Sequence, residues 1–364
     1  MSDALGSARE LVSDRVGDRA GEWDRAGRLP LDLLRDLGSA GVLCAQVPVK
    51  DGGLGLSSKE NGELTAHLGA LCGSTRSVAT SQGMAAWVIT RLGSRRQRTA
   101  FLPRLTGGEL AAVAFSEPEA GSDLAAMATE IRRDGDDVVV SGEKVWITVG
   151  AYADLVVVFG RFGDGAAAVV VPTAAAGVVV ERVEDPLGCR AAGHATVRLD
   201  SVRVPADHLL GAAGQSLSLL VTSALTYGRV SIAWGCVGIL RSCREAAASH
   251  ARSRTQSGKP LAEHQLVAEH LAELLVAEQV ATRMCEHAST CWDDGSPDLV
   301  IASVLAKHVA ATNAARGAAS AVQVLGSAGA RDGHPVARAY RDAKLMEIIE
   351  GSNEICRLLL AGAA

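Results

Sequence analysis

Three polar segments of the chain carry residues that could bind a ligand or move a proton. The first is Phe-Ser-Glu-Pro-Glu-Ala-Gly-Ser-Asp at residues 115–123. Gly121 and its small neighbours leave backbone N–H groups open, and Ser116 and Ser122 add hydroxyl groups. Such a loop suits an electron-rich heterocycle or a phosphate. A capped surface turn has the same composition, so this segment alone leaves both interpretations open.

The second segment is Lys144-Val-Trp-Ile-Thr148. A spacing of two residues predicts that Trp146 and Thr148 lie on the same side of a β-strand. Trp146 could then stack on a ring while Thr148 forms a hydrogen bond with its edge. A tryptophan at a seam between domains is the alternative interpretation.

The third segment, residues 346–354, places Glu350 directly before Gly351 and after two isoleucines. A helix that ends at Gly351 would leave this carboxylate pointing into a cleft. In an apolar pocket the pKa of Glu350 would rise toward that of a usable general base. A solvated acid at a helix end is the alternative.

The elements that must position these segments follow from the hydrophobic periodicity. Apolar residues at helical spacing, such as Leu31, Leu34 and Leu37, dominate the first third of the chain. Short valine-rich runs separated by turns then predict an antiparallel sheet or barrel, and helical spacing returns after Pro205. We therefore expect an α+β fold with an N-terminal helical domain (1–110), a middle antiparallel β-barrel-like domain (111–206) and a C-terminal four-helix bundle (207–364).

Composition removes several classes of function. With 48% hydrophobic and 21% charged residues, the chain of 364 residues is not disordered, and its net charge of −5 argues against a nucleic-acid partner. No dinucleotide-binding or P-loop motif occurs. His264 and His270 lie six residues apart, which does not fit a zinc-binding helix, and we expect no metal site. The eight cysteines form no C-x-x-C pair and are expected to be small buried hydrophobic residues.

The cellular location is predicted from what the chain lacks. The N-terminal residues contain no apolar signal core, and the two long uncharged stretches are interrupted by polar residues, proline or glycine. We expect a cytoplasmic protein without a membrane partner.

The three segments, in this order and spacing, resemble the acyl-CoA dehydrogenase family of flavoproteins. The resemblance extends over nearly the whole chain through further motifs at residues 199–205, 254–265, 323–329, 341–344 and 349–357. Each motif is weak alone, but the ordered set is specific. It favours the ligand-binding interpretation of all three segments.

The resemblance implies FAD as the cofactor and a homodimer or dimer of dimers whose subunit interface completes each flavin site. Glu350 matches the base that removes the α-proton of an acyl thioester while the β-hydrogen leaves as hydride. The backbone N–H of the base and a ribityl hydroxyl then hold the thioester oxygen. A separate electron acceptor reoxidises the flavin.

The same resemblance assigns further site residues. Those matching flavin-binding positions are Phe115, Ser116, Gly121, Ser122, Trp146, Ile147 and Thr148, with Thr148 near the reactive flavin nitrogen. Those matching positions on the ADP half of a neighbouring subunit's FAD are Arg254, Gln256, Gln265, Gln323 and Gly326. Ser352 and Glu354 match later cofactor contacts, although Glu354 stands where glutamine is common. Expected substrate contacts are Ser122, Arg76, Arg229 and Gly351.

Two departures from the family concern the substrate. Residues 160–165 form a short hairpin where many relatives have a longer loop that holds the CoA nucleotide, and Thr226 stands where an aspartate often contacts pantetheine. We infer an acyl thioester on an acyl carrier protein, as in polyketide extender-unit pathways such as methoxymalonyl formation. Arg76 resembles the arginine of glutaryl-CoA dehydrogenases that pairs with a distal carboxylate, which predicts a polar or anionic acyl group.

Three alternatives remain open from the sequence. One is a catabolic short-chain acyl-CoA dehydrogenase that uses free CoA thioesters. Another is a flavin-bound member of the fold that binds DNA or a protein with little turnover, although the net charge and Glu350 weigh against it. The third is a flavin monooxygenase, which would need no base at Glu350.

Overall fold

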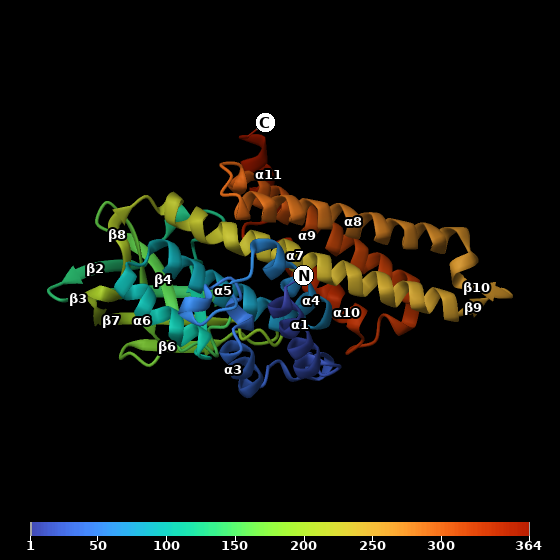
Figure 1. Cartoon of the computed structure of the whole chain (residues 1–364), viewed down its shortest axis with the longest axis horizontal. Coiled ribbons are helices and arrows are strands. Elements are labelled where there is room, and N and C mark those ends of the chain that lie inside the picture. Colours follow the sequence, from blue (N-terminus) through green and yellow to red (C-terminus); the bar gives the residue numbers. More distant parts are fainter. Residues whose placement is uncertain (1, 364) are drawn as a thin grey trace.

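The structure, a computed structural model, describes residues 2–363, with helices at both ends of the chain and strands between them (Figure 1). The N-terminal helices are α1 (Asp3–Val16), α2 (Ala20–Ala26), α3 (Leu31–Ser39), α4 (Ser58–Leu71), α5 (Gly73–Leu92) and α6 (Arg95–Thr106). The C-terminal helices are α7 (Leu217–Ser253), α8 (Gln265–Asp293), α9 (Leu299–Leu325), α10 (Pro335–Met346) and α11 (Asn353–Ala361). This order confirms the predicted fold class.

The middle region is one eight-stranded sheet. Its strands are β1 (Ala111–Ala114), β2 (Glu130–Asp134), β3 (Asp137–Ile147), β4 (Leu155–Phe162), β5 (Gly165–Pro172), β6 (Val178–Arg182), β7 (Ala195–Pro205) and β8 (Leu209–Gln215). They are ordered β6-β7-β3-β2-β4-β5-β8, with β1 beside β4. Most pairs are antiparallel, as the short intervals between strands predict, but β4 pairs in parallel with β1 and with β2.

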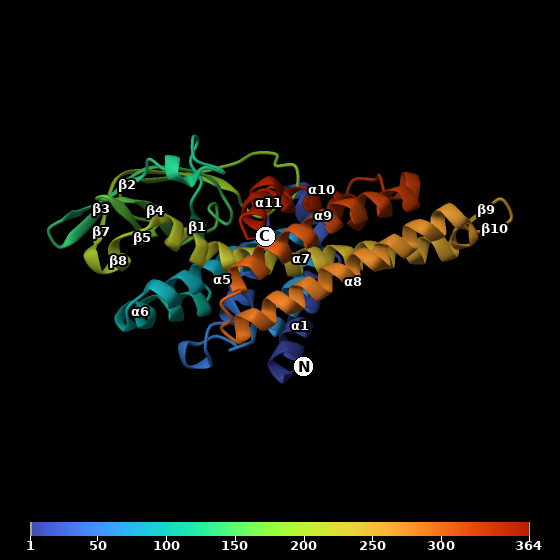
Figure 2. The same ribbon diagram turned by 90° about the horizontal axis from the view of Figure 1, so that it is seen from above.

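Helices α5 and α6 lie against one side of this sheet (Figure 2). Leu102 and Leu105 of α6 share a core cluster with Val157, Phe159 and Val170 of the sheet, all of them fully buried or nearly so. Strand β4 is apolar on both faces for this reason, since each of its faces is covered. The sheet therefore offers a rigid edge against which the helices can place a site.

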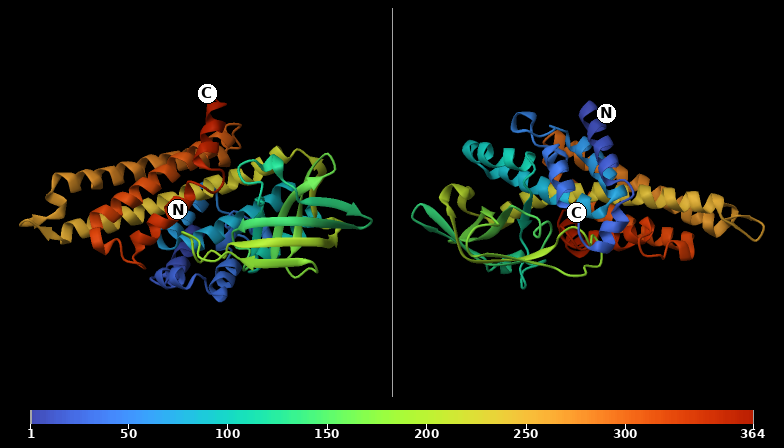
Figure 3. Two further views of the ribbon diagram at one scale, coloured as in Figure 1. Left: turned by 180° about the vertical axis from the view of Figure 1, so that it is seen from behind. Right: turned by 90° about the horizontal axis from the view of Figure 1, so that it is seen from below.

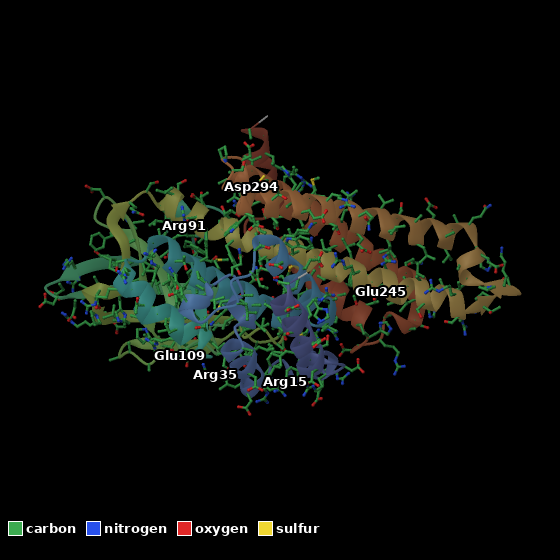
Figure 4. All side chains as sticks on the ribbon, viewed as in Figure 1. Arg15, Arg35, Arg91, Glu109, Glu245 and Asp294 are labelled. Carbon is green, nitrogen blue, oxygen red and sulfur yellow. The ribbon has the colours of Figure 1, made fainter. Side chains whose placement is uncertain are left out.

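The N-terminal helices are also tied to the sheet by polar contacts. Arg35 of α3 donates hydrogen bonds to Gly108 O and Asp154 Oδ1, each at 2.8 Å. Figure 4 labels Arg35 beside Glu109, which forms an ion pair with Arg104 at 2.7 Å. Seen from behind, the N-terminal helices lie beside the sheet while the helical bundle extends away from it (Figure 3).

Small side chains allow the long helices of the bundle to pack closely. Helix α9 buries a row of alanines at three- and four-residue spacing: Ala302, Ala306, Ala310, Ala314, Ala318 and Ala321. A two-stranded hairpin, β9 (Thr255–Gln256) and β10 (Lys259–Pro260), joins α7 to α8 at the end of the bundle far from the sheet (Figure 1).

All eight cysteines are buried as free thiols, as predicted. Among residues 2–363, no helix combines the length and the apolar character needed to cross a membrane. The domain limits at residues 110 and 206 stay predictions.

Candidate active site

Glu350 lies in the segment between α10 and α11, where the sequence predicts a base. Helix α10 ends at Met346, so the prediction that the helix ends at Gly351 is wrong: the last four residues before Gly351 are not helical. Glu350 and Gly351 have φ values of 56° and 87°. A positive φ is uncommon for a residue other than glycine, and surrounding contacts must hold it.

Those contacts come from two buried cations. Lys307 of α9 is fully buried and donates hydrogen bonds to Gly351 O at 2.6 Å and to Glu347 O at 3.5 Å. Arg229 of α7 donates from Nε to Glu350 O at 3.2 Å. The carbonyl groups on both sides of the turn are therefore fixed, which fixes the direction of the Glu350 side chain.

The Glu350 carboxyl points at α7. A Cβ atom added at Gly228 would lie 2.3 Å from Glu350 Oε2 and 2.5 Å from Met84 Cε, so the carboxyl group packs directly against this glycine. Oε2 is buried and has no hydrogen-bond partner among the described residues. The carboxyl group is therefore shielded from solvent, and one of its oxygens has no hydrogen-bond partner.

Burial raises the pKa of Glu350 to about 7, and the nearby charges of Arg229, Lys307 and Arg76 oppose that rise. A carboxyl group with a pKa near neutrality takes up a proton readily yet is ionised in part of the population. This is the balance that a general base requires.

Arg76 of α5 lies inside the protein, with 1% of its surface exposed, and not on the helix surface. Its guanidinium contacts Thr80 Oγ1 at 3.4 Å, Met346 Sδ at 3.1 Å and Cys189 Sγ at 3.8 Å. Its Nε atom has no partner, and no described carboxylate forms an ion pair with it. A buried cation without an anion is costly unless a ligand compensates it.

Trp146 and Thr148 lie where β3 ends. The strand stops at Ile147, a bulge interrupts its pairing with β7, and Trp146 has a φ of 57°. Thr148 is therefore beyond the strand, and the predicted shared strand face is wrong because the bulge breaks the two-residue alternation. Trp146 is 57% exposed, whereas Ile147 is buried.

Sequence reasoning missed His194, which is 8% exposed and packs beside these residues. Its Nδ1 lies 3.3 Å from Thr148 Oγ1, and its Nε2 is buried without a partner. Burial, with Arg76 and Arg182 nearby, lowers the pKa of His194 to about 4, so the ring is neutral. A lone histidine between glycine and alanine carries no sequence signal of this role.

A buried ion pair supports the loop 115–123, and the sequence alone does not reveal this pair. Glu117 accepts hydrogen bonds from Lys144 Nζ at 2.7 Å and from the backbone N–H of Thr129 at 3.0 Å. Lys144 Nζ also donates to Phe115 O at 3.0 Å. Burial lowers the pKa of Lys144 to about 8 against the opposing effect of Glu117.

The outward side of this loop is open. Gly121 and Ser122 are exposed, and Ser116 is half-buried. Phe115 packs its ring against Phe159, with ring centroids 4.3 Å apart. The loop thus presents its glycine and serines to the surface, where a ligand could reach them.

The remaining predicted cofactor residues are not brought to Glu350 within one chain. Arg254, Gln256, Gln265, Gln323 and Gly326 are exposed, the first three around the β9–β10 hairpin and the last two at the end of α9. Ser352 accepts a hydrogen bond from Ile355 N and caps α11, and Glu354 is exposed.

The residues around Glu350 fit a flat heterocycle. Trp146 is 57% exposed and lies beside His194, with ring centroids 6.0 Å apart, and the segment that carries Glu350 leaves Ile348 54% exposed. An apolar ring system with polar edges would cover these apolar side chains and approach the polar groups of Thr148 and His194.

Comparisons with known proteins identify the family of this chain. Three family models match: the acyl-CoA dehydrogenase N-terminal domain over residues 3–109, its middle domain over 112–202 and its C-terminal domain over 219–364. The probable acyl-CoA dehydrogenase YngJ of Bacillus subtilis (strain 168) is 32% identical, over 97% of this chain and 96% of the relative.

Two solved structures are similar over almost their full lengths. FkbI, described for the biosynthesis of the methoxymalonyl extender unit of the polyketide immunosuppressant Fk520, is 61% identical with a TM-score of 0.94, covering 98% of both chains. A glutaryl-CoA dehydrogenase from Mycobacterium smegmatis in complex with FADH2 is 29% identical with a TM-score of 0.93, covering 99% of this chain and 93% of the other.

Proposed function

This chain belongs to the acyl-CoA dehydrogenase family, whose members bind FAD, and we propose that it uses FAD to oxidise a short polar acyl thioester carried on an acyl carrier protein. The observation that carries the proposal is the 61% identity to FkbI over 98% of both chains. The pathway we propose is the formation of a polyketide extender unit of the methoxymalonyl type.

The chain's own residues account for proton removal. Glu350 would take the proton from the carbon next to the thioester carbonyl, since its Oε2 is buried, unpartnered and close to α7. The backbone N–H of Glu350 is available to hold the thioester oxygen as negative charge develops there. When bound, FAD supplies an acceptor for the hydride that leaves the neighbouring carbon.

The residues that would hold FAD come from two subunits. Phe115, Ser116, Gly121, Ser122, Trp146, Ile147, Thr148, Ser352 and Glu354 would act within one subunit, and Arg254, Gln256, Gln265, Gln323 and Gly326 within its neighbour. Helix α8 supports such a homodimer, because Leu266, Leu275, Val276 and Val280 leave 43–76% of their surfaces exposed along it. Apolar exposure of this extent is typical of a face that another copy covers.

Two features support a carrier protein over free CoA. The β4–β5 hairpin is short, with Phe162 paired to Gly165 across a two-residue turn. Thr226 is buried and donates its hydroxyl to Thr222 O within α7, so it offers no charged contact to pantetheine. Ser122, Arg229 and Gly351 would contact the thioester group, and Arg76 the distal part of the acyl chain.

The test is an anaerobic titration of the purified yellow holoprotein with one acyl group on two carriers. We expect the flavin absorbance to bleach with both thioesters and kcat/KM to be clearly higher on the carrier protein. A clearly higher kcat/KM on CoA would replace the carrier proposal by the short-chain CoA alternative. No bleaching with any thioester would reject oxidation itself.

A further inference from the structure

Four arginines surround the turn where α5 ends and α6 begins. Arg91 is in the last turn of α5, and Arg95, Arg96 and Arg98 are among the first four residues of α6. Three of them are exposed, and Arg98 is half-buried. The sequence contains no aspartate or glutamate from residue 64 to residue 108, although the whole chain has a net charge of −5. We call these four residues the arginine patch.

Most of the charge of this patch is not balanced within the chain. Arg96 forms an ion pair with Asp207 at 3.2 Å, and 84% of its side chain is still exposed. Among the residues that the structure describes, no carboxylate forms an ion pair with Arg91, Arg95 or Arg98. The patch is therefore a region of positive surface potential on a protein whose net charge is negative.

The stability of α6 does not account for the patch. The backbone N–H groups at a helix N-terminus carry partial positive charge, so acidic residues are favourable in the first turn and cations are not. The first turn of α6 contains no acid and begins with Arg95 and Arg96. Sequences depart from such a local preference mainly at functional positions. This departure indicates a partner of opposite charge outside the chain.

The patch lies at the outer end of the helix whose middle contacts the base. Met84 of α5 and the Glu350 carboxyl group pack against the same residue, Gly228 of α7. Arg91 follows Met84 by two turns of α5, which is a rise of about 10 Å along the helix. The phosphopantetheine arm of a carrier protein is longer than this rise. A carrier docked on the patch can therefore bring its thioester to Glu350.

The patch also lies near the short β4–β5 hairpin. Gln97 of α6 donates hydrogen bonds from Nε2 to Asp207 O and Leu209 O, each at 2.7 Å, where β8 begins. Strand β8 pairs with β5, the second strand of the hairpin. One strand thus connects α6 to the hairpin. Both features belong to the same part of the molecule, and both fit a protein carrier.

We propose that the arginine patch is the docking surface for the acyl carrier protein that presents the substrate. Acyl carrier proteins are acidic, so their charge complements that of the patch. Complementary charges speed the association of two proteins and set the orientation in which they dock. The inference rests on the proposed oxidation of a carrier-bound thioester and adds the surface that recognises the carrier.

Arg95→Glu is the main test variant, because Arg95 has no carboxylate partner in the described chain and an acid suits the first turn of α6. Its unfolding free energy should stay unchanged or rise. A double variant, Arg91→Glu with Arg95→Glu, reverses more of the charge. The matched control is Arg28→Glu, which reverses an exposed arginine between α2 and α3. Arg35 of α3 and Arg91 lie at opposite edges of the molecule in Figure 4.

The experiment measures kcat and KM for flavin reduction with one short polar acyl group on three carriers. These are the acyl carrier protein of a methoxymalonyl-type pathway, CoA and pantetheine. In Arg95→Glu we expect KM on the carrier protein to rise about tenfold, and further in the double variant, with KM on pantetheine within about twofold. Added salt should raise the wild-type KM on the carrier protein and narrow the difference between wild type and variant. Arg28→Glu should resemble the wild type.

Three results would overturn the docking surface. The first is an unchanged KM on the carrier protein in both patch variants. The second is an equal rise on all three carriers, which would place the effect in the active site. The third is a rise on CoA as large as that on the carrier protein with pantetheine unchanged, which would assign the patch to phosphate groups.

A binding measurement separates this proposal from the proposed oxidation. Titration calorimetry of the holoenzyme with the unacylated carrier protein, its phosphopantetheine arm attached, needs no turnover. Arg95→Glu should weaken this binding about tenfold, and binding as tight as that of the wild type would reject the docking surface. If the wild type reduces its flavin with none of the thioesters, the proposed oxidation fails, and the calorimetry still decides whether the patch binds the carrier.

Discussion

Two buried cations of this molecule differ in how their charge is balanced. Lys144 under the loop 115–123 and Arg76 in α5 are exposed by 0% and 1%. Lys144 has its own carboxylate, Glu117, at 2.7 Å, whereas Arg76 contacts only a hydroxyl group and two sulfur atoms. The first pair is complete without a ligand and supports the scaffold. The second has no carboxylate partner, and we propose that it serves a ligand.

Glu350 shares this incompleteness. Three cations, Arg76, Arg229 and Lys307, surround it from α5, α7 and α9, and its Oε2 is unpartnered. The site therefore holds more positive charge than its one acid balances. Such a surplus would stabilise a substrate in which negative charge develops as a proton leaves.

The largest effect should come from Glu350→Gln. The amide has the same shape but cannot accept the proton, so we expect the rate of flavin reduction to fall by about a thousandfold or more. FAD binding and thermal stability should be kept, because Oε2 makes no hydrogen bond that would be lost. Anaerobic stopped-flow bleaching of the flavin measures the rate.

The matched control is Glu10→Gln, which changes an exposed acid of α1. It should leave the rate of flavin reduction within a few-fold of the wild type. A rate in Glu350→Gln close to that of the control would show that the acid is not the base.

Removing Lys144, the cation that is paired with a carboxylate, should lower the free energy of unfolding. Lys144→Met leaves Glu117 buried without its partner, and breaking a buried pair in this way costs about 3–5 kcal/mol of unfolding free energy. Denaturant unfolding measures the loss, which the double variant with Glu117→Gln should largely recover. A single variant as stable as the wild type would contradict the scaffold role of this pair.

Removing Arg76, the cation without a carboxylate partner, should lower turnover without destabilising the fold. Arg76→Met deletes a buried charge that has no carboxylate partner, so the unfolding free energy without substrate should not fall. Turnover of an oxygen-bearing acyl thioester should drop about 10- to 100-fold, with butyryl thioester affected less. A stability loss as large as that of Lys144→Met would erase the contrast between the two cations.

The sequence predicts the fold well because periodicity is local. The β-branched run Val138–Val140 and the helical spacing around Leu271 and Leu274 are visible without any tertiary contact. The end of α10 is not visible in this way. Residues 347–350 leave the helix because Lys307, some forty residues away in sequence, donates hydrogen bonds to Glu347 O and Gly351 O.

Residues of the candidate site can be predicted where a sequence motif contains them. They cannot be predicted where only their burial in the folded chain identifies them. Glu350 and Thr148 follow from the family resemblance, which also favoured Arg76. His194 and Lys307 lie in no motif, and the motif around Glu117 does not reveal its buried partner. The importance of all three comes from contacts made by segments distant in sequence. An unpartnered ring nitrogen is a property of the folded chain alone.

The smallest effect should come from Lys307→Met and should appear in the pH profile. Wild-type flavin reduction should rise with pH through about 7, since burial raises the pKa of Glu350 and the base must be ionised to act. Lys307 opposes that rise in pKa, so without its charge the acid limb of the profile should move to higher pH. The rate just below neutrality should then fall about three- to tenfold, while the rate at alkaline pH approaches that of the wild type. Lys344→Met, which removes an exposed lysine of α10, is the matched control and should leave the profile in place. A loss of equal size at every pH would mean that Lys307 acts only by holding Gly351 O and Glu347 O, and that its charge, unlike that of Lys144, has no electrostatic role.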